Sequence, residues 1–178
     1  MRDSKTRVIV FSAICIALAL ALDYVKLFTM PQGGSVSACS MFFIVLAGYW
    51  FGPVIGCLTG VVVGLIDLML AGYVVHPIQL LLDYPLAFGM LGFAGFFRKM
   101  RFALPIGYVA GAAGRFIMHL LSGYIFFAQY TPEGQHPFIY SAVYNILYMA
   151  PEVLITLVII CFPAFGKVVD TVGKRWFK

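Results

Sequence analysis

About six apolar runs divide the sequence, each close to the roughly 20 residues that a helix needs to cross a hydrocarbon core about 30 Å thick. Of its 178 residues, 62% are hydrophobic and 11% are charged, which excludes a soluble domain. The sequence predicts an all-α membrane protein with one integral domain over residues 1–178. Six transmembrane helices are expected over residues 7–27, 38–51, 53–72, 78–97, 103–129 and 138–165.

Basic residues predict the orientation of this bundle. The formal net charge is +5, and the Lys and Arg side chains cluster at run ends rather than in a patch for nucleic acid. Short cytoplasmic loops carry the excess of such residues, so both termini and the turn at residues 98–101 are expected in the cytoplasm. The first run resembles a signal peptide at Arg7 but continues past Leu20 without a clear small-residue cleavage site, which indicates a retained helix.

Motifs of soluble enzymes and of metal sites are absent from the sequence. It contains no Walker A pattern, no HExxH, no GxSxG and no dinucleotide fingerprint. The four cysteines are scattered without a CxxC pair or a histidine at zinc-site spacing, so no metal site is expected. Active transport by this chain would need energy from a partner or from an ion gradient.

Polar residues in the outer half of three runs predict a ligand pocket. Asp83, His119 and Asn145 fall at similar depth, with Tyr140 nearer the surface and Gly123 on the face of His119. We expect Gly123 to leave room for a ligand. A carboxylate with aromatic rings suits a small cationic aromatic molecule. The alternative is that each polar group is satisfied internally within the bundle.

A second group of ionisable residues lies near mid-depth. Arg115 is expected to bridge Asp67 and Glu152, because an ionisable group in hydrocarbon is costly without a partner. Such a group would lock helices three, five and six together. A proton or ion path is the functional alternative, although a relay would need more titratable groups.

Small residues form a stripe on the first run. Ala13, Ala17 and Ala21 recur at i, i+4 and i+8, a spacing that lets another helix approach closely. The stripe predicts either packing within the bundle or a docking surface for a partner.

Four segments together resemble one family. They are LLLDYPLAFG at 80–89, GFAGFFR at 92–98, HLLSGYIFFAQY at 119–130 and YSAVYN at 140–145. They are similar to the thiamine-specific substrate-binding component of energy-coupling-factor (ECF) transporters of prokaryotic cell membranes. The resemblance implies that thiamine lies near the outer face, against Asp83, Tyr84, His119, Gly123, Phe127, Tyr140 and Asn145.

The resemblance also implies partners and no cofactor of the chain's own. A transmembrane coupling subunit would dock on the alanine stripe, and two cytoplasmic ATPases would use ATP. The chain departs from the family where Asp83 replaces a common glutamate and Phe127 occupies a position that can hold tryptophan. The outer loop at 30–40 lacks a tryptophan that can close over thiamine, and Trp50 and Trp176 are expected on the cytoplasmic side.

These departures leave a related ligand open, such as the free aminopyrimidine precursor of thiamine. With one predicted carboxylate and no Lys or Arg, the pocket is expected to disfavour phosphorylated ligands. Two further classes remain as alternatives. An intramembrane enzyme would use His119 as base, oriented by Asp83 or Glu152, with Ser122 the nearest nucleophile. An ion-coupled carrier would need no ATPase, but no internal repeat of the kind such carriers use is evident.

Overall fold

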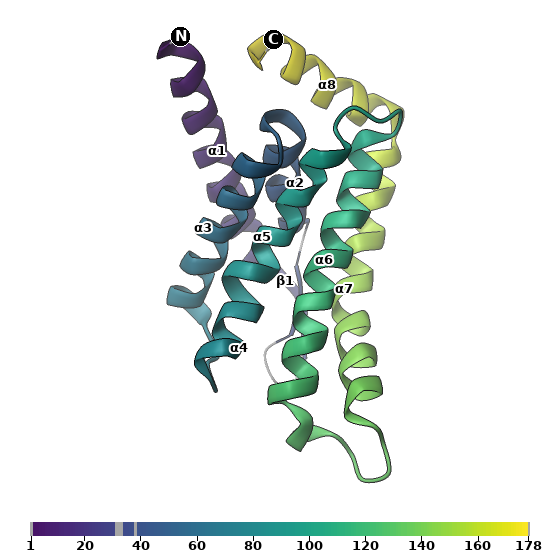
Figure 1. The fold of residues 1–178 in the computed structure, drawn as a ribbon. Helices are drawn as coiled ribbons and strands as arrows, with labels where there is room; N and C mark the ends of the chain where they lie inside the picture. Colours follow the sequence, from purple (N-terminus) through teal and green to yellow (C-terminus); the bar gives the residue numbers. More distant parts are fainter. Residues whose placement is uncertain (1, 31–33, 38, 178) are drawn as a thin grey trace.

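The computed structural model describes residues 2–30, 34–37 and 39–177 as a bundle of apolar helices (Figure 1). Within these residues, five helical spans are long and apolar enough to cross a membrane. They are Ser4–Asp23 in α1 (Arg2–Asp23), α3 (Pro53–Ala71), the composite span Pro77–Phe97, α6 (Ala103–Phe126) and α7 (Pro137–Cys161). Together with the shorter apolar α2 (Ser40–Phe51), they confirm the predicted all-α bundle of six spans.

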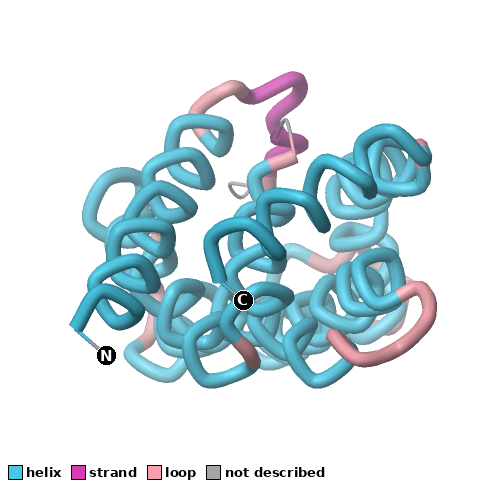
Figure 2. Tube along the Cα trace, turned by 90° about the horizontal axis from the view of Figure 1, so that it is seen from above, coloured by secondary structure: helices cyan, strands magenta, loops and turns pink. Residues whose placement is uncertain are grey.

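The second span differs from a full transmembrane helix. α2 has 12 residues, which at about 1.5 Å per residue is shorter than a hydrocarbon core about 30 Å thick. A hairpin of β1 (Lys26–Thr29) and β2 (Ser35–Ser37), which the sequence did not predict, precedes it. Strand backbone at membrane depth is tolerated only where protein surrounds it or where it lines a cavity. β2 is largely buried, and its Ser35 and Ser37 line a cavity, whereas all four residues of β1 are exposed. Figure 2 shows the hairpin at the edge of the bundle.

Three predicted helix ends are corrected. α1 ends at Asp23 rather than at 27, and α6 ends at Phe126 rather than at 129, before a 3₁₀ turn η4 (Ala128–Tyr130). α7 ends at Cys161 rather than at 165, because a proline disfavours helical geometry in the residue before it. Phe162, which precedes Pro163, accordingly has an extended ψ of 120°.

A further helix, α8 (Pro163–Phe177), was not predicted and lies across the end of the bundle that holds the N-terminus (Figures 1 and 2). The Tyr49 hydroxyl donates to Asp170 Oδ1 at 2.7 Å, and Arg7 Nη1 donates to the Trp176 carbonyl at 3.0 Å. Both termini and the connection between the fourth span and α6 lie at this end, whereas the connection from α6 to α7 lies at the other (Figure 1). This arrangement agrees with an even number of spans.

The fourth span is irregular where the site residues lie. It consists of α4 (Pro77–Leu81), a π turn η2 (Leu82–Leu86), α5 (Ala87–Leu91) and a 3₁₀ segment η3 (Gly92–Phe97). Pro85 has no N–H to donate, and its ring would clash with the carbonyl one turn earlier, so a regular α-helix cannot continue through it. Asp83 and Tyr84 sit in the widened turn that results.

Glycines on α3 let this irregular span approach closely. Gly56, Gly60 and Gly64 recur at i, i+4 and i+8, a small-residue pattern typical of tightly packed membrane helices. A Cβ atom at Gly64 would lie 2.6 Å from the carbonyl oxygen of Tyr84, and one at Gly60 would collide with the backbone of Phe88. The backbone of α3 therefore supports the turn that carries Asp83.

We expect Gly60→Ala to lower the melting temperature of the detergent-purified protein, because overpacking a tight contact costs about 1–3 kcal/mol. Gly166→Ala is the matched control, since a Cβ atom there meets nothing within 4 Å. That variant should retain or gain stability, by up to about 1 kcal/mol, because alanine favours helix over glycine. Thermal unfolding followed by fluorescence measures both, and equal shifts would contradict the packing described.

Candidate ligand-binding site

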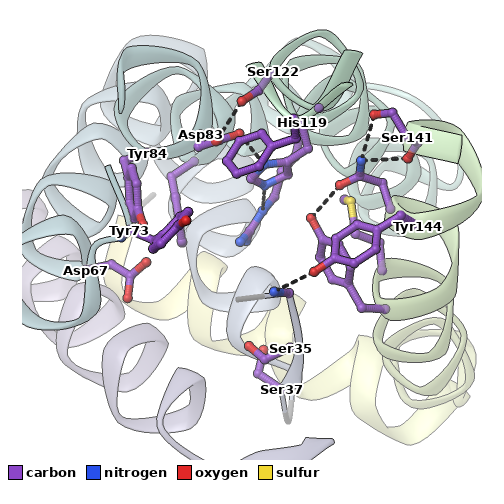
Figure 3. Close-up of a pocket in the computed structure, with 18 of the residues that line it drawn as sticks. Ser35, Ser37, Asp67, Tyr73, Asp83, Tyr84, His119, Ser122, Ser141 and Tyr144 are labelled. Carbon is purple, nitrogen blue, oxygen red and sulfur yellow. Dashed lines mark hydrogen bonds and ion pairs between the residues drawn. The ribbon is translucent and has the colours of Figure 1, made fainter. Parts of the chain in front are cut away.

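A cavity lies between the hairpin, α3, the fourth span, α6 and α7 (Figure 3). All seven residues predicted to bind the ligand line it: Asp83, Tyr84, His119, Gly123, Phe127, Tyr140 and Asn145. Asp67, Arg115 and Glu152, which the sequence analysis assigned to a separate mid-depth layer, line it as well. The two predicted layers therefore form one cavity.

Asp83 is the centre of a hydrogen-bond network on one wall. Its Oδ2 atom accepts from Gln79 Nε2 and from Ser122 Oγ, each at 2.7 Å, and its Oδ1 atom lies 3.0 Å from His119 Nδ1. A carboxylate has about four acceptor positions, so three are occupied by the protein itself. Gln79 also donates to the Tyr73 carbonyl at 3.1 Å, which ties the network to the loop after α3.

His119 connects Asp83 to Arg115. Arg115 Nε donates to His119 Nε2 at 3.2 Å, so Nε2 is the acceptor nitrogen and the imidazole proton lies on Nδ1, facing Asp83. This is the tautomer in which both ring nitrogens are satisfied. The order from Arg115 through His119 to Asp83 places a positive group behind the imidazole and a negative group in front of it.

The predicted bridge from Arg115 to two carboxylates is wrong. Arg115 lies 4.0 Å from the centre of the Phe88 ring, and among the described residues it forms no ion pair with Asp67 or Glu152. Its partner is His119, one turn along the same helix, where side chains at i and i+4 are natural neighbours. A partner on its own helix replaces the predicted bridge between helices.

Glu152 instead holds the start of α2. Its carboxylate accepts from Ser37 Oγ at 2.8 Å, from Ser40 Oγ at 3.1 Å and from the Met41 backbone N–H at 3.1 Å. A carboxylate at a helix N-terminus satisfies free N–H groups and interacts favourably with the helix dipole. Because Ser37 belongs to β2, the same carboxylate links the hairpin to α7.

Asn145 and Gly123 have structural roles in addition to lining the cavity. Asn145 Nδ2 donates to the Ser141 carbonyl at 2.8 Å, and its Oδ1 atom accepts from the Tyr148 hydroxyl at 2.7 Å. A Cβ atom at Gly123 would collide with the Ser141 side chain, so this glycine lets α6 and α7 pack closely. The predicted room for a ligand at Gly123 is thus largely occupied by α7.

Aromatic rings form two groups on the cavity walls. Tyr140, Tyr144 and Tyr148 follow one another along α7, with neighbouring centroids 6.4 and 5.8 Å apart. Phe127 lies 6.1 Å from the ring of Tyr73 and 6.1 Å from that of Tyr130. These rings offer stacking surfaces for a flat ligand.

Several lining residues escaped the sequence analysis. Tyr144 and Tyr148 could have been found by extending the i+4 spacing from Tyr140, whereas Gln79 carried no signal except its place one turn before Asp83. Ser122 was considered only as a nucleophile for His119, but its hydroxyl donates to Asp83 instead.

The predicted charge of the cavity is corrected. The lining contains four carboxylates, Asp23, Asp67, Asp83 and Glu152, and two cations, Lys26 and Arg115, instead of one carboxylate and no cation. The prediction failed because it assigned Asp67, Arg115 and Glu152 to a separate layer. The sequence also does not reveal that the end of α1, with Asp23, and the hairpin, with Lys26, fold against the cavity. The excess of carboxylates still favours a cationic ligand.

The structure also places Trp50 and the alanine stripe on α1, both of which lie outside the cavity. Trp50 does not line it, and its Nε1 atom donates to the Val169 carbonyl at 3.3 Å, at the end where α8 lies. Ala13, Ala17 and Ala21 are all exposed on α1, while Cys15 and Ala19 are buried on another face. The stripe is therefore not covered by the bundle itself.

A cavity with a polar, net-negative and aromatic lining, enclosed by apolar spans, defines a membrane protein that binds a small organic molecule. A family model described as thiamine transporter protein (Thia_YuaJ) matches residues 9–168. The chain belongs to this family, which is a family of multi-pass membrane transporters and not of enzymes. Membership confirms the resemblance found in the sequence.

Individual relatives agree with this assignment. Thiamine transporter ThiT of Bacillus subtilis is 35% identical to the chain and covers 90% of it, with 92% of the relative matched. Thiamine transporter ThiT of Lacticaseibacillus paracasei is 29% identical, over 82% of the chain and 81% of the relative. A solved structure of ThiT from Listeria monocytogenes has a TM-score of 0.79 over 97% of the chain and 98% of its own length, at 22% identity, and supports the fold.

We expect Glu152→Gln to loosen the first turn of α2, because an amide NH₂ replaces one of the two acceptor oxygens and a lost buried partner costs about 1–3 kcal/mol. Hydrogen exchange of the Met41 amide should become faster, and the melting temperature should fall. Asp170→Asn is the control, since this exposed carboxylate accepts one hydrogen bond at the surface. An unchanged Met41 exchange rate in Glu152→Gln would exclude the proposed capping role.

Proposed function

We propose that this chain binds thiamine near the outer face of the cell membrane and serves as the substrate-binding subunit of an ECF vitamin importer. The observation that carries the proposal is the convergence of the family's ligand positions, from three separate spans, on one cavity around Asp83. Family membership supplies the class of transporter.

The chemistry of thiamine matches the cavity lining. Thiamine joins an aminopyrimidine ring, which has hydrogen-bond donors and acceptors on its edge, to a positively charged thiazolium ring. The network of Asp83 and His119 can bind the polar edge, with one acceptor position of Asp83 still available. Phe127, Tyr73 and Tyr140 supply ring faces for stacking and for cation–π attraction.

Transport would require partners in this proposal. The chain has no nucleotide-binding motif, so ATP would be used by two cytoplasmic ATPase subunits joined through a transmembrane coupling subunit. The exposed stripe of Ala13, Ala17 and Ala21 supports a docking surface on α1, since small side chains let a partner helix approach closely.

Asp83→Ala should weaken thiamine binding by about a hundredfold or more, because it removes a buried carboxylate and leaves three donors without their acceptor. Calorimetric titration into the detergent-purified protein measures the affinity. Glu133→Ala is the control, since this exposed carboxylate lies between α6 and α7 and does not line the cavity. Normal affinity in Asp83→Ala would exclude Asp83 as a ligand contact.

The same titration tests the identity of the ligand. Thiamine should bind more tightly than the aminopyrimidine fragment, thiamine diphosphate or riboflavin. The diphosphate should be disfavoured because the cavity has more carboxylates than cations. If the aminopyrimidine fragment bound more tightly than thiamine, the chain would be a binding subunit for that precursor instead.

Ala17→Trp should abolish ATP-driven thiamine uptake in vesicles that contain the coupling subunit and the ATPases, because a large ring prevents close helix contact. Thiamine affinity of the isolated chain should be unchanged, since Ala17 does not line the cavity. Ala113→Trp is a matched control on the exposed surface of α6 and should retain uptake. Equal loss of uptake in both variants would contradict docking on α1.

A further inference from the structure

Asp67 lies inside a membrane-spanning helix and, among the described residues, has no partner in a hydrogen bond or ion pair. It lies on α3 four residues before the helix ends at Ala71, lines the cavity and is partly shielded from solvent. Among the described residues it forms no hydrogen bond and no ion pair, and its only interactions are longer-range electrostatic ones. Carboxylates at such positions are costly, and those that persist usually mark a functional contact.

The carboxylates in the interior of two other spans, Asp83 and Glu152, already have donors from the protein. Asp83 accepts from three side chains, and Glu152 accepts from two hydroxyls and a backbone N–H. Asp67 differs from both of them, because no donor among the described residues occupies its carboxylate oxygens. Figure 3 shows its carboxylate apart from the hydrogen bonds of Asp83 and on the same side of the cavity as Tyr73 and Tyr84.

The neighbouring charges do not take the place of a partner. Lys26 and Arg115 act on Asp67 favourably from a distance, but neither forms an ion pair with it, and Arg115 is held by His119 and Phe88. Asp23, the last residue of α1, acts on Asp67 unfavourably. A second negative group nearby increases the need for a positive charge in the cavity.

We infer that Asp67 is the counter-charge of the cationic ring of the ligand, while Asp83 and its donors bind the uncharged polar edge. This assignment rests on the proposed function, since it divides thiamine between two carboxylates of one cavity. The rings of Tyr73 and Tyr84, which Figure 3 shows on the same side of the cavity as Asp67, add faces that attract an organic cation. Asp67 thereby selects for charge, and Asp83 selects for hydrogen-bonding pattern.

The experiment removes the negative charge of Asp67 in one step and the positive charge of the ligand in another. The probes are thiamine and a neutral analogue in which a thiophene ring replaces the thiazolium, titrated into wild type and Asp67→Asn. Asp67→Asn should bind thiamine about ten- to a hundredfold more weakly, the range expected for a close charge pair. The neutral analogue should bind both proteins equally, within about threefold, because no charge pair is left to lose. Competition against labelled thiamine allows weaker dissociation constants to be measured than direct titration does.

Three controls make the result specific. Asp83→Ala should weaken both probes, because its network binds the edge that they share. Glu133→Gln, at an exposed carboxylate that does not line the cavity, should change thiamine affinity by less than about threefold, since a distant exposed charge contributes little. The melting temperature of ligand-free Asp67→Asn should not fall, because Asp67 makes no hydrogen bond within the described residues.

The outcomes separate the inference from the function on which it rests. If wild type binds thiamine but Asp67→Asn weakens both probes equally or neither, the assignment of Asp67 is wrong and thiamine binding stands. A loss of thiamine affinity in Glu133→Gln as large as that in Asp67→Asn would also overturn it. If wild type does not bind thiamine, the proposed function is wrong and the inference with it.

Discussion

The carboxylate of Glu152 satisfies the start of α2 inside the bundle, and the arrangement of the outer half depends on it. A helix begins with N–H groups that lack partners, and in hydrocarbon each would be costly. The N-cap residue Cys39 provides no side-chain hydrogen bond, whereas Glu152 accepts from the Met41 N–H and from Ser40. α2 can therefore begin partway through the bundle. The hairpin precedes it, and Ser35 and Ser37 of β2 line the cavity.

One face of α7 connects this support to the cavity. Tyr144, Tyr148 and Glu152 recur every four residues, and all three line the cavity. The Tyr144 hydroxyl accepts from the Gly34 N–H at 3.0 Å, so the hairpin is held at two points by the same helix. Tyr148 is fixed by its hydrogen bond to Asn145. Because α7 residues hold the hairpin and the Tyr148 ring in place, these parts of the cavity lining would need little further ordering when a ligand binds.

The length and depth constraints of a membrane made the number of spans and the place of the cavity predictable. They did not make predictable the hydrogen-bond partners of buried charges or the structure of the segments between spans. Apolar runs of fixed length predict six spans, and the depths of Asp83, His119 and Asn145 correctly place them around one cavity. Depth does not predict which partner a buried charge chooses, so the link from Arg115 to His119 was missed. The hairpin and α8 were missed for another reason. Their residues are neither apolar enough for a span nor polar enough for a plain loop, and only packing against the bundle determines their structure.

The charged residues in the interior of the spans are gathered around the cavity, away from the surface that faces lipid. Asp67, Asp83, Arg115 and Glu152, the charged residues in the interior of the described spans, all line the cavity. The exposed surface of these spans is apolar, with side chains such as Leu58, Val143 and Leu154 facing outward. A change of tilt therefore moves no unpaired charge into hydrocarbon, where its cost would be high. A bound cation adds to this balance, because it offsets the excess negative charge of the cavity.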